Sequence, residues 1–230
     1  MLRAHAREVG KRLAAVVRTP TSSIARAPRE GIVEIAGRVV PAEEGTVVAP
    51  ITGQDAVYVR VLVERPVGSS RETVLDDIQV RPFLVDDGTG SALVHIGPKA
   101  HAELEPSRLS GDAQEHARAA SLLAARGKDP SEVKRLVWKE WLVAPGASLY
   151  VLGAGGAEKL GPSPAGYRDR PDTRLVVTSP PPGGPDEMIV STYSEAELQT
   201  RLRGSLTIIR FAMIVCVVVG VGGAFYLASK

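Results

Sequence analysis

Two adjacent aspartates followed by Gly-Thr-Gly are the residues of this sequence whose types and spacing could carry out chemistry. In the stretch "RPFLVDDGTGSALVHIG" (81–97), Asp86 and Asp87 follow an apolar segment and precede Gly88, Thr89 and Gly90. Carboxylates after a strand can hold a metal ion or accept a phosphoryl group. The same residue types are also those that tight turns prefer. The run is therefore a candidate for a phosphoryl-transfer or metal site, or for a turn between two strands.

The run lacks the groups that phosphoryl transfer or metal binding requires. Phosphatases of the haloacid dehalogenase type carry Asp-x-Asp-x-Thr after an apolar strand, and their first Asp is the nucleophile. If Asp87 and Thr89 fill the later positions, Val85 fills the nucleophile position, and a valine cannot attack phosphorus. Asp76 and Asp77 do not add the spaced oxygen ligands of a calcium loop. We therefore expect no catalytic residue and no metal here.

A hairpin accounts better for the same residues. Phe83 and Val85 alternate on one side of the run, and Ala92, Val94 and Ile96 alternate on the other. Asp and Gly tolerate the positive φ angles of tight turns, and the Thr89 hydroxyl can hydrogen-bond the loop backbone. We predict a structural turn over Asp86, Asp87, Gly88, Thr89 and Gly90.

Short alternating segments surround this turn and would position it. The segment "GIVEIAGRVV" (31–40) places Val33, Ile35 and Val39 on one face and Glu34 and Arg38 on the other. The segment "AVYVRVLVER" (56–65) places valines on one face and Tyr58, Arg60 and Glu64 on the other. Further short apolar segments follow, separated by turns rich in Gly and Pro. This pattern predicts a mainly β fold, an OB-like barrel or sandwich of short strands.

One helical insertion, about residues 112–134, interrupts the strands. The segment "GDAQEHARAASLLAARGKD" is rich in alanine, with Asp112 as a candidate N-cap and Gly127 as a terminator. In "DPSE", Asp129 offers a second N-cap with Pro130 at the first helical position. We expect a further turn of helix there.

The C-terminal segment predicts a transmembrane helix over 205–228. Residues 211–228 carry no charge for 18 residues and would span roughly 27 Å as a helix; a buried core helix is the alternative. Because Arg201 and Arg203 precede the span, Arg210 enters it and only Lys230 follows it, we expect a single-pass C-terminal anchor with the bulk of the chain in the cytoplasm. A small-residue pair, Gly220 and Ala224, could support a homo-oligomer through this helix.

The N-terminal residues 1–18 predict a basic amphipathic helix. One face carries the apolar residues Leu2, Ala6, Val9, Leu13, Val16 and Val17. The opposite face carries the cations Arg3, Arg7, Lys11 and Arg18. Such a helix can lie on an anionic membrane surface or pack on the rest of the protein, and both interpretations stay open.

Composition restricts the functions further. The net charge is +2, so no strong field requires nucleic acid as a partner. Cys216 is the one cysteine, and the four histidines show no metal-ligand spacing, which excludes a disulfide framework and a four-ligand Cys/His zinc site. We expect no cofactor.

Several motifs in order resemble a known family. "FLVDDGTGSALVHI" followed by "APGASLYVLGAGG" is similar to the OB-fold pattern, and the chain from about 19 to 203 resembles the GIDE, or beside-a-membrane, domain of bacterial type. The resemblance also includes "VVAPITGQDAVYVRVLVER" and "EMIVSTYSEAELQTRLR". It implies a GIDE-like β domain over 19–193. Independently of the resemblance, Ser194 and Glu197 form a capping box that predicts a juxtamembrane helix over 194–204, which runs on or kinks at Gly204 before the span.

The family is named for mitochondrial ubiquitin ligases in which a RING finger follows the domain, and one cysteine cannot build a RING. We therefore expect a membrane-anchored, non-catalytic interaction or scaffold domain that contacts the lipid bilayer and an unidentified protein partner. An E3 ubiquitin ligase-like transferase is the first alternative. The second is an OB-type single-strand nucleic-acid binder, for which Tyr58 and Arg60 are the candidate surface patch.

Overall fold

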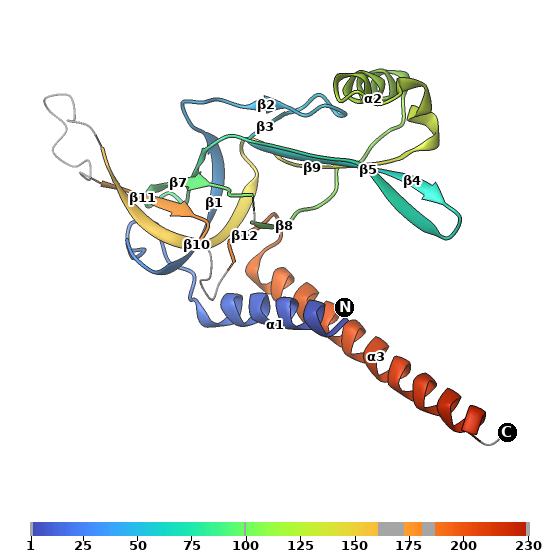
Figure 1. Ribbon diagram of the computed structural model, residues 1–230. Coiled ribbons are helices and arrows are strands. Elements are labelled where there is room, and N and C mark those ends of the chain that lie inside the picture. The colour runs from blue at the N-terminus through green and yellow to red at the C-terminus, as the bar shows by residue number, and fades with distance from the viewer. Residues whose placement is uncertain (1, 99, 161–172, 181–186, 229–230) are drawn as a thin grey trace, which may run out of the picture.

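A closed five-stranded barrel forms the centre of the protein. The computed structural model describes residues 2–98, 100–160, 173–180 and 187–228, with side chains of the last helix described as far as Met213 (Figure 1). The barrel strands are β1 (Ile32–Pro41), β6 (Phe83–Asp86), β7 (Ser91–His95), β11 (Thr173–Thr178) and β10 (Ser148–Lys159). They neighbour one another in that order, and β10 pairs back onto β1. The pair β7–β11 is parallel and the other barrel pairs are antiparallel. The expected mainly β fold with a barrel is therefore confirmed.

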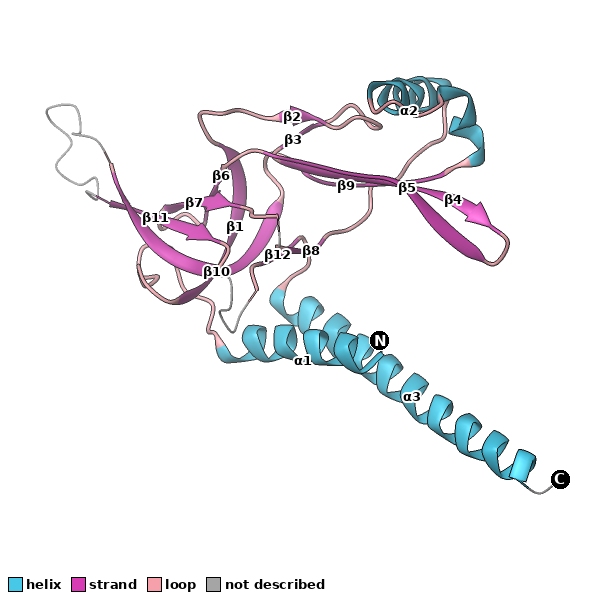
Figure 2. Ribbon diagram, in the orientation of Figure 1, coloured by secondary structure: helices cyan, strands magenta, loops and turns pink. Residues whose placement is uncertain are grey.

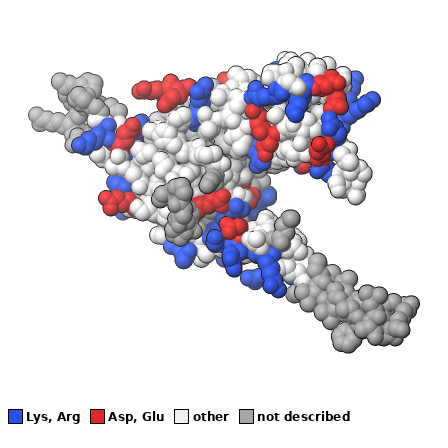
Figure 3. Space-filling view, viewed as in Figure 1, with Lys and Arg blue, Asp and Glu red and all other residues white. Residues whose placement is uncertain are grey.

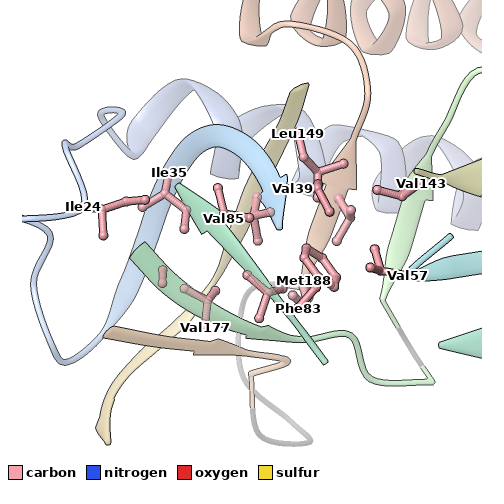
Figure 4. Packing of buried hydrophobic residues seen from close by; sticks show 14 of the residues in the cluster. Ile24, Ile35, Val39, Val57, Phe83, Val85, Val143, Leu149, Val177 and Met188 are labelled. Atoms are coloured by element: carbon pink, nitrogen blue, oxygen red, sulfur yellow. The ribbon is translucent and has the colours of Figure 1, made fainter. Parts of the chain in front are cut away.

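The barrel is filled by alternating apolar side chains. Figure 4 shows Ile35, Val85 and Val177 pointing toward a common interior, with Phe83 and Met188 beside them. Phe83 and Val85 of β6 are fully buried, as are Ala92 and Val94 of β7. Full burial of an aliphatic or aromatic side chain contributes roughly 1.5–3 kcal/mol. The alternation read from the sequence around the Asp-Asp-Gly-Thr-Gly run is thus the alternation of the barrel core.

A second sheet is built from two insertions into the barrel. Its strands are β4 (Tyr58–Val67), β5 (Ser70–Val80) and β9 (Val137–Val143), in the order β5-β4-β9. A short hairpin of β2 (Val47–Val48) and β3 (Asp55–Ala56) and the helix α2 (Ala113–Ala125) lie beside this sheet (Figure 2). Strands β2 to β5 lie between β1 and β6 in the sequence, whereas α2 and β9 lie between β7 and β10.

The helical insertion occurs where its caps predict it. The Asp112 carboxylate accepts a hydrogen bond from the Glu115 amide at 2.8 Å at the start of α2. Gly127 has a φ of 66° just after the helix, a conformation that costs other residues more. Asp129 then caps the 3₁₀ helix η1 (Pro130–Arg135) by accepting from the Ser131 amide.

The terminal helices α1 (Leu2–Arg18) and α3 (Glu195–Ala228) lie side by side below the barrel (Figure 1). The short strand β12 (Ile189–Ser191) pairs with β10 and leads into α3, and β8 (His101–Glu103) pairs with the other edge of β12. The residues shared between helices and barrel form one apolar cluster: Val9, Ala15, Val16, Tyr150, Leu152, Ile189, Leu198, Leu202, Leu206 and Ile209. Of the two interpretations of the N-terminal helix, the structure shows packing on the protein. Leu2 and Val17, predicted on its apolar face, are 40% and 53% exposed.

The predicted transmembrane helix over 205–228 is not supported by the structure. Within the part of the chain that the structure describes, no helix is both long and apolar enough to span a membrane. Leu206 and Ile209, which the sequence assigned to the span, are instead buried against α1 and the barrel. Leu206 and Ile209 therefore serve packing within the protein. A single helix runs from Glu195 through this region without a break at Gly204.

Candidate binding groove

An open groove of about 980 Å³ lies between the barrel and the start of α3. One wall is formed by β1 and the β6–β7 turn, and the floor by β10. The other wall is the segment 192–197, where β12 leads into α3. The capping box at this point is present: the Glu197 carboxylate accepts from the Ser194 amide at 2.9 Å and from its hydroxyl at 2.7 Å. These hydrogen bonds lower the pKa of Glu197.

The groove walls carry more acidic than basic side chains. Asp86 and Asp87 line it from the turn, and Glu195 and Glu197 line it from α3. Arg38 of β1 is the one cation among the described lining residues, and its guanidinium donates to the Gly146 carbonyl at 3.2 Å. Tyr193 provides an aromatic ring at the rim, and the Arg201 guanidinium lies 3.7 Å from the ring centroid. The groove therefore suits a ligand with positive charge.

A buried carboxyl group lies beneath the wall of this groove. Glu34 of β1 is fully buried, and the Tyr150 hydroxyl donates to its carboxylate at 2.7 Å. The Thr21 hydroxyl contacts Glu34 on one side and the Glu195 carboxylate, at 3.1 Å, on the other. A threonine hydroxyl has one hydrogen, so both contacts are hydrogen bonds only when one of the two carboxyl groups is protonated.

Burial selects Glu34 as the group that takes up the proton. Removal from water raises its pKa above the ordinary 4.5, against the opposing hydrogen bonds from Thr21 and Tyr150, and the nearby charge of Glu195 raises it further. Burial also raises the pKa of Tyr150, with Glu34 and Glu195 adding to the effect, so the phenol stays protonated and remains a donor. Glu34, Thr21 and Glu195 thus link the barrel interior to the first turn of α3.

The predicted turn residues shape the rim of the groove and a neighbouring loop. The Asp87 carboxylate accepts from the Thr89 amide at 2.8 Å, the Thr89 hydroxyl at 2.7 Å and the Gly90 amide at 3.2 Å. Its other oxygen accepts from the Ile24 amide at 2.8 Å, which ties the turn to the chain before β1. Asp86 accepts from the Gly88 amide, and Gly88 has a φ of 82°. Burial opposes the low pKa of Asp87, but these hydrogen bonds prevail and lower it.

Two details of the turn differ from the expectation. Among the described residues only glycines have positive φ, so the aspartates serve through their carboxylates and not through their backbone conformation. The Thr89 hydroxyl donates to the Asp87 side chain and accepts from the Ala25 amide at 3.3 Å, outside its own loop. The turn holds two separate segments of chain together.

The predicted surface patch of Tyr58 and Arg60 is wrong. Tyr58 is 4% exposed because its ring packs in the barrel core where β4 begins. The Arg60 guanidinium is held by two hydrogen bonds to Asp76, at 2.8 and 2.7 Å, and lies 5.8 Å from the Trp141 ring. A buried ring offers no stacking surface to a base, so this pair gives no support to nucleic-acid binding.

The residues that the sequence did not identify are Thr21, Glu34, Tyr150, Tyr193 and Glu195. Glu34 lies on the face of β1 opposite Val33 and Ile35, so the alternating pattern did not mark it as part of the core. Its partners lie 13 and 116 residues away, so no local signal marks them. The capping box was the available signal for Glu195, because it fixed where α3 begins.

No metal centre accompanies the groove in the described part of the chain. Within residues 2–98, 100–160, 173–180 and 187–228, no three potential ligands among His, Cys, Asp and Glu come together in a way that could hold a metal ion.

The fold and the groove define a mainly β protein whose barrel carries an open groove at the start of a C-terminal helix. A family model described as "GIDE: E3 Ubiquitin ligase" matches residues 64–225, more than two thirds of the chain. The protein belongs to the GIDE family, as its motifs predicted. The match begins within β4, so it does not include residues 19–63, where the predicted resemblance started. No curated protein and no solved structure matches the chain.

Proposed function

We propose that this protein is a membrane-anchored, non-catalytic interaction module of the GIDE family that binds a cationic segment of a partner protein in the groove. The observation that carries the proposal is the excess of carboxylates on the groove walls, four against one arginine among the described lining residues. A groove lined by one sign of charge attracts and orients a segment of the opposite sign.

The barrel topology supports an interaction role. The order β1-β6-β7-β11-β10 with return to β1 and one parallel pair is the arrangement of an OB-type Greek-key barrel. Such barrels serve as scaffolds whose loops bind ligands. Here the groove is formed by a barrel turn, a barrel strand and the first turn of α3.

The membrane anchor is the second part of the proposal. Residues 211–228 contain no charged side chain, and α3 is helical as far as Ala228. Eighteen helical residues would reach across roughly 27 Å, close to the thickness of the hydrocarbon core. The cations Arg201, Arg203 and Arg210 precede this stretch, which favours the cytoplasmic side for the barrel. Resistance of the membrane-bound protein to alkaline carbonate would support the anchor, and complete release would contradict it.

Site-specific crosslinking tests the groove. A photoreactive amino acid at Ser148, an exposed groove residue, should form an adduct with a partner protein, whereas the same residue at Val67, at the tip of the β4–β5 hairpin, should not. Neutralising the walls with Asp86→Asn and Glu197→Gln should abolish the adduct while preserving hydrogen-bond acceptors. The matched control Glu43→Gln with Glu44→Gln removes two exposed carboxylates elsewhere. Equal adducts at both positions, or an adduct unaffected by neutralisation, would contradict the groove.

The description of the family as an E3 ubiquitin ligase favours ubiquitin transfer as a second candidate function. The 230 residues contain one cysteine, so they do not contain the Cys and His ligands of a RING. Incubation of the purified protein with ubiquitin, an activating enzyme and a conjugating enzyme should give no product above the reaction without it. Reproducible ubiquitin conjugates that depend on the protein would replace the interaction module with a ligase.

A further inference from the structure

The apolar and polar faces of α1 differ in their exposure to solvent. Its apolar face is used inside the protein: Val9, Ala15 and Val16 are at most 4% exposed in the cluster with α3. Arg12 fixes the same helix to the chain before β12 through an ion pair of 2.8 Å with Glu187. An amphipathic helix enters a membrane with its apolar face. Because the central part of that face is already buried, α1 offers lipid mainly its polar face.

The polar face of α1 is a stripe of cations. Arg3, Arg7 and Lys11 are exposed and follow at intervals of four residues, which places them along one side of the helix. Glu8 is the one acidic residue of α1, and it pairs with Lys11 at 3.2 Å. Arg203 and Arg210 of α3 are exposed as well, and the described side chains of α3 include no carboxylate after Glu197. Figure 3 shows Lys and Arg side chains gathered below the barrel, in the region that the two helices occupy in Figure 1.

Apolar side chains border this stripe near the end of the described side chains of α3. Ile208 and Phe211 are 72% and 68% exposed, on either side of Arg210, and Leu2 is exposed at the start of α1. Figure 1 shows the N-terminus of α1 lying along the middle of α3, so these positions lie at the same end of the helix pair. Exposed cations beside exposed apolar groups are typical of a surface at the membrane–water interface.

We propose that the exposed cations Arg3, Arg7 and Lys11 of α1, with Arg203 and Arg210 of α3, bind the anionic headgroups of the bilayer that holds the anchor. This inference rests on the proposed anchor, because that segment places the stripe near the lipid. Contact is electrostatic and α1 does not insert, since Val9, Ala15 and Val16 stay packed in the cluster with α3. The contact holds α1 and the barrel against the membrane and weakens as salt rises.

Energy transfer between α1 and lipid headgroups tests the proposal in the full chain. A fluorescent donor at His5→Cys, with Cys216→Ala, is placed in nanodiscs that carry headgroup acceptors and either phosphatidylcholine alone or added phosphatidylserine. We expect greater transfer in the anionic discs, and loss of this increase at high salt. The variant Arg3→Gln, Arg7→Gln, Lys11→Gln should lose the increase at all salt concentrations.

A matched variant controls for general charge. Lys128, Lys134 and Arg135 are exposed cations near α2 and η1, and the triple glutamine variant there should keep the full increase. Equal transfer in both lipids, or equal losses in both variants, would overturn the inference. A single-stranded oligonucleotide that binds through the same three α1 cations, without any lipid effect, would assign the stripe to nucleic acid instead and also overturn it.

The experiment distinguishes failure of the proposed membrane anchor from failure of the proposed cationic stripe. If the protein does not enter phosphatidylcholine discs, the anchor fails, and cosedimentation with phosphatidylserine vesicles then tests the stripe alone. Salt-sensitive binding that the three α1 substitutions reduce on the order of 100-fold would support the stripe without the anchor. Absence of vesicle binding would overturn both.

Discussion

Two glutamates, Glu34 in the barrel and Glu140 in the second sheet, are fully buried, and they differ in what they bind. The Glu140 carboxylate accepts from the backbone amides of Ile51 and Thr52 at 2.9 and 3.1 Å. Glu34 instead meets two side-chain hydroxyls, from Thr21 and Tyr150. A backbone amide can only donate, whereas a hydroxyl can both donate and accept. If the Glu34 carboxyl group takes up a proton, a neighbouring hydroxyl can therefore rotate and accept a hydrogen bond from it.

The surroundings of Glu140 hold one turn of chain in a fixed conformation. While Glu140 of β9 takes the amides of Ile51 and Thr52, the Arg118 guanidinium of α2 donates to the carbonyls of the same two residues, at 3.2 and 2.8 Å. Gly53 follows with a φ of 74°, and a Cβ there would lie within 2.9 Å of Arg118. Both the amide and the carbonyl sides of this turn are thus satisfied by charged side chains. We interpret Glu140 as structural and Glu34 as sensitive to pH.

Removal of Glu140 should have the largest effect on stability. Glu140→Ala leaves two amides of the β2–β3 turn without their acceptor, that of Ile51 buried and that of Thr52 partly buried, and each such loss costs about 1–3 kcal/mol. We expect the free energy of unfolding to fall by about 3 kcal/mol, measured by denaturant titration of the full chain in detergent. Hydrogen exchange should accelerate at the Ile51 and Thr52 amides. Glu44→Ala, an exposed control, should change neither quantity; a similar loss in that variant would refute the assignment.

The contrast between these glutamates marks how far the sequence predicts the structure. Several features could be predicted because each depends on residues close in sequence. They are the core alternation of β1, the caps of α2, the capping box before α3 and the family. The same alternation placed Glu34 outside, since β1 in isolation has one free face. That face is covered by Thr21 and Tyr150, and only the closure of the barrel brings Tyr150 of β10 next to β1.

Long-range pairing also explains the other misses. Tyr58 and Arg60 alternate as an exposed pair, but β4 pairs with β5 on one side and with β9 on the other, and β9 lies about 80 residues away. Those strands supply Asp76, which forms an ion pair with Arg60, and Trp141, whose ring lies against the Arg60 guanidinium. Leu206 and Ile209 were assigned to the membrane span because hydropathy does not distinguish a lipid environment from contact with another helix. That other helix, α1, lies nearly 200 residues away in the chain, so no local pattern indicates the contact. The groove joins elements from both ends of the chain and has no local signature.

Asp87 extends the comparison to an exposed turn and should give the next largest effect. Like Glu140, it accepts from backbone amides, so Asp87→Asn should destabilise the protein by about 2 kcal/mol at neutral pH. Asp86→Asn, which disturbs a single amide contact, should cost less than about 1 kcal/mol.

The effect of Asp87 should also depend on pH. Because the pKa of Asp87 is lowered in the folded state, its contribution to the free energy of unfolding is present above its ordinary 3.8 and disappears as pH falls through the lowered value. The gap between wild type and Asp87→Asn should therefore narrow on acidification, as followed by unfolding titrations at several pH values.

Glu34→Gln should give the smallest effect, and its pH dependence should have the opposite sign. The amide of glutamine is close in shape to the protonated carboxyl group, and it can both accept from Tyr150 and donate to Thr21, so we expect a change under about 1 kcal/mol near pH 7. Because the pKa of Glu34 is raised in the folded state, its stabilising contribution is complete below 4.5 and is lost as pH rises through the raised value. Wild type should therefore lose stability relative to Glu34→Gln as pH increases, whereas it gains stability relative to Asp87→Asn over the range in which Asp87 ionises. Parallel pH curves for wild type and Glu34→Gln would show that Glu34 does not titrate differently in the folded state, and the distinction between the two buried glutamates would then fail.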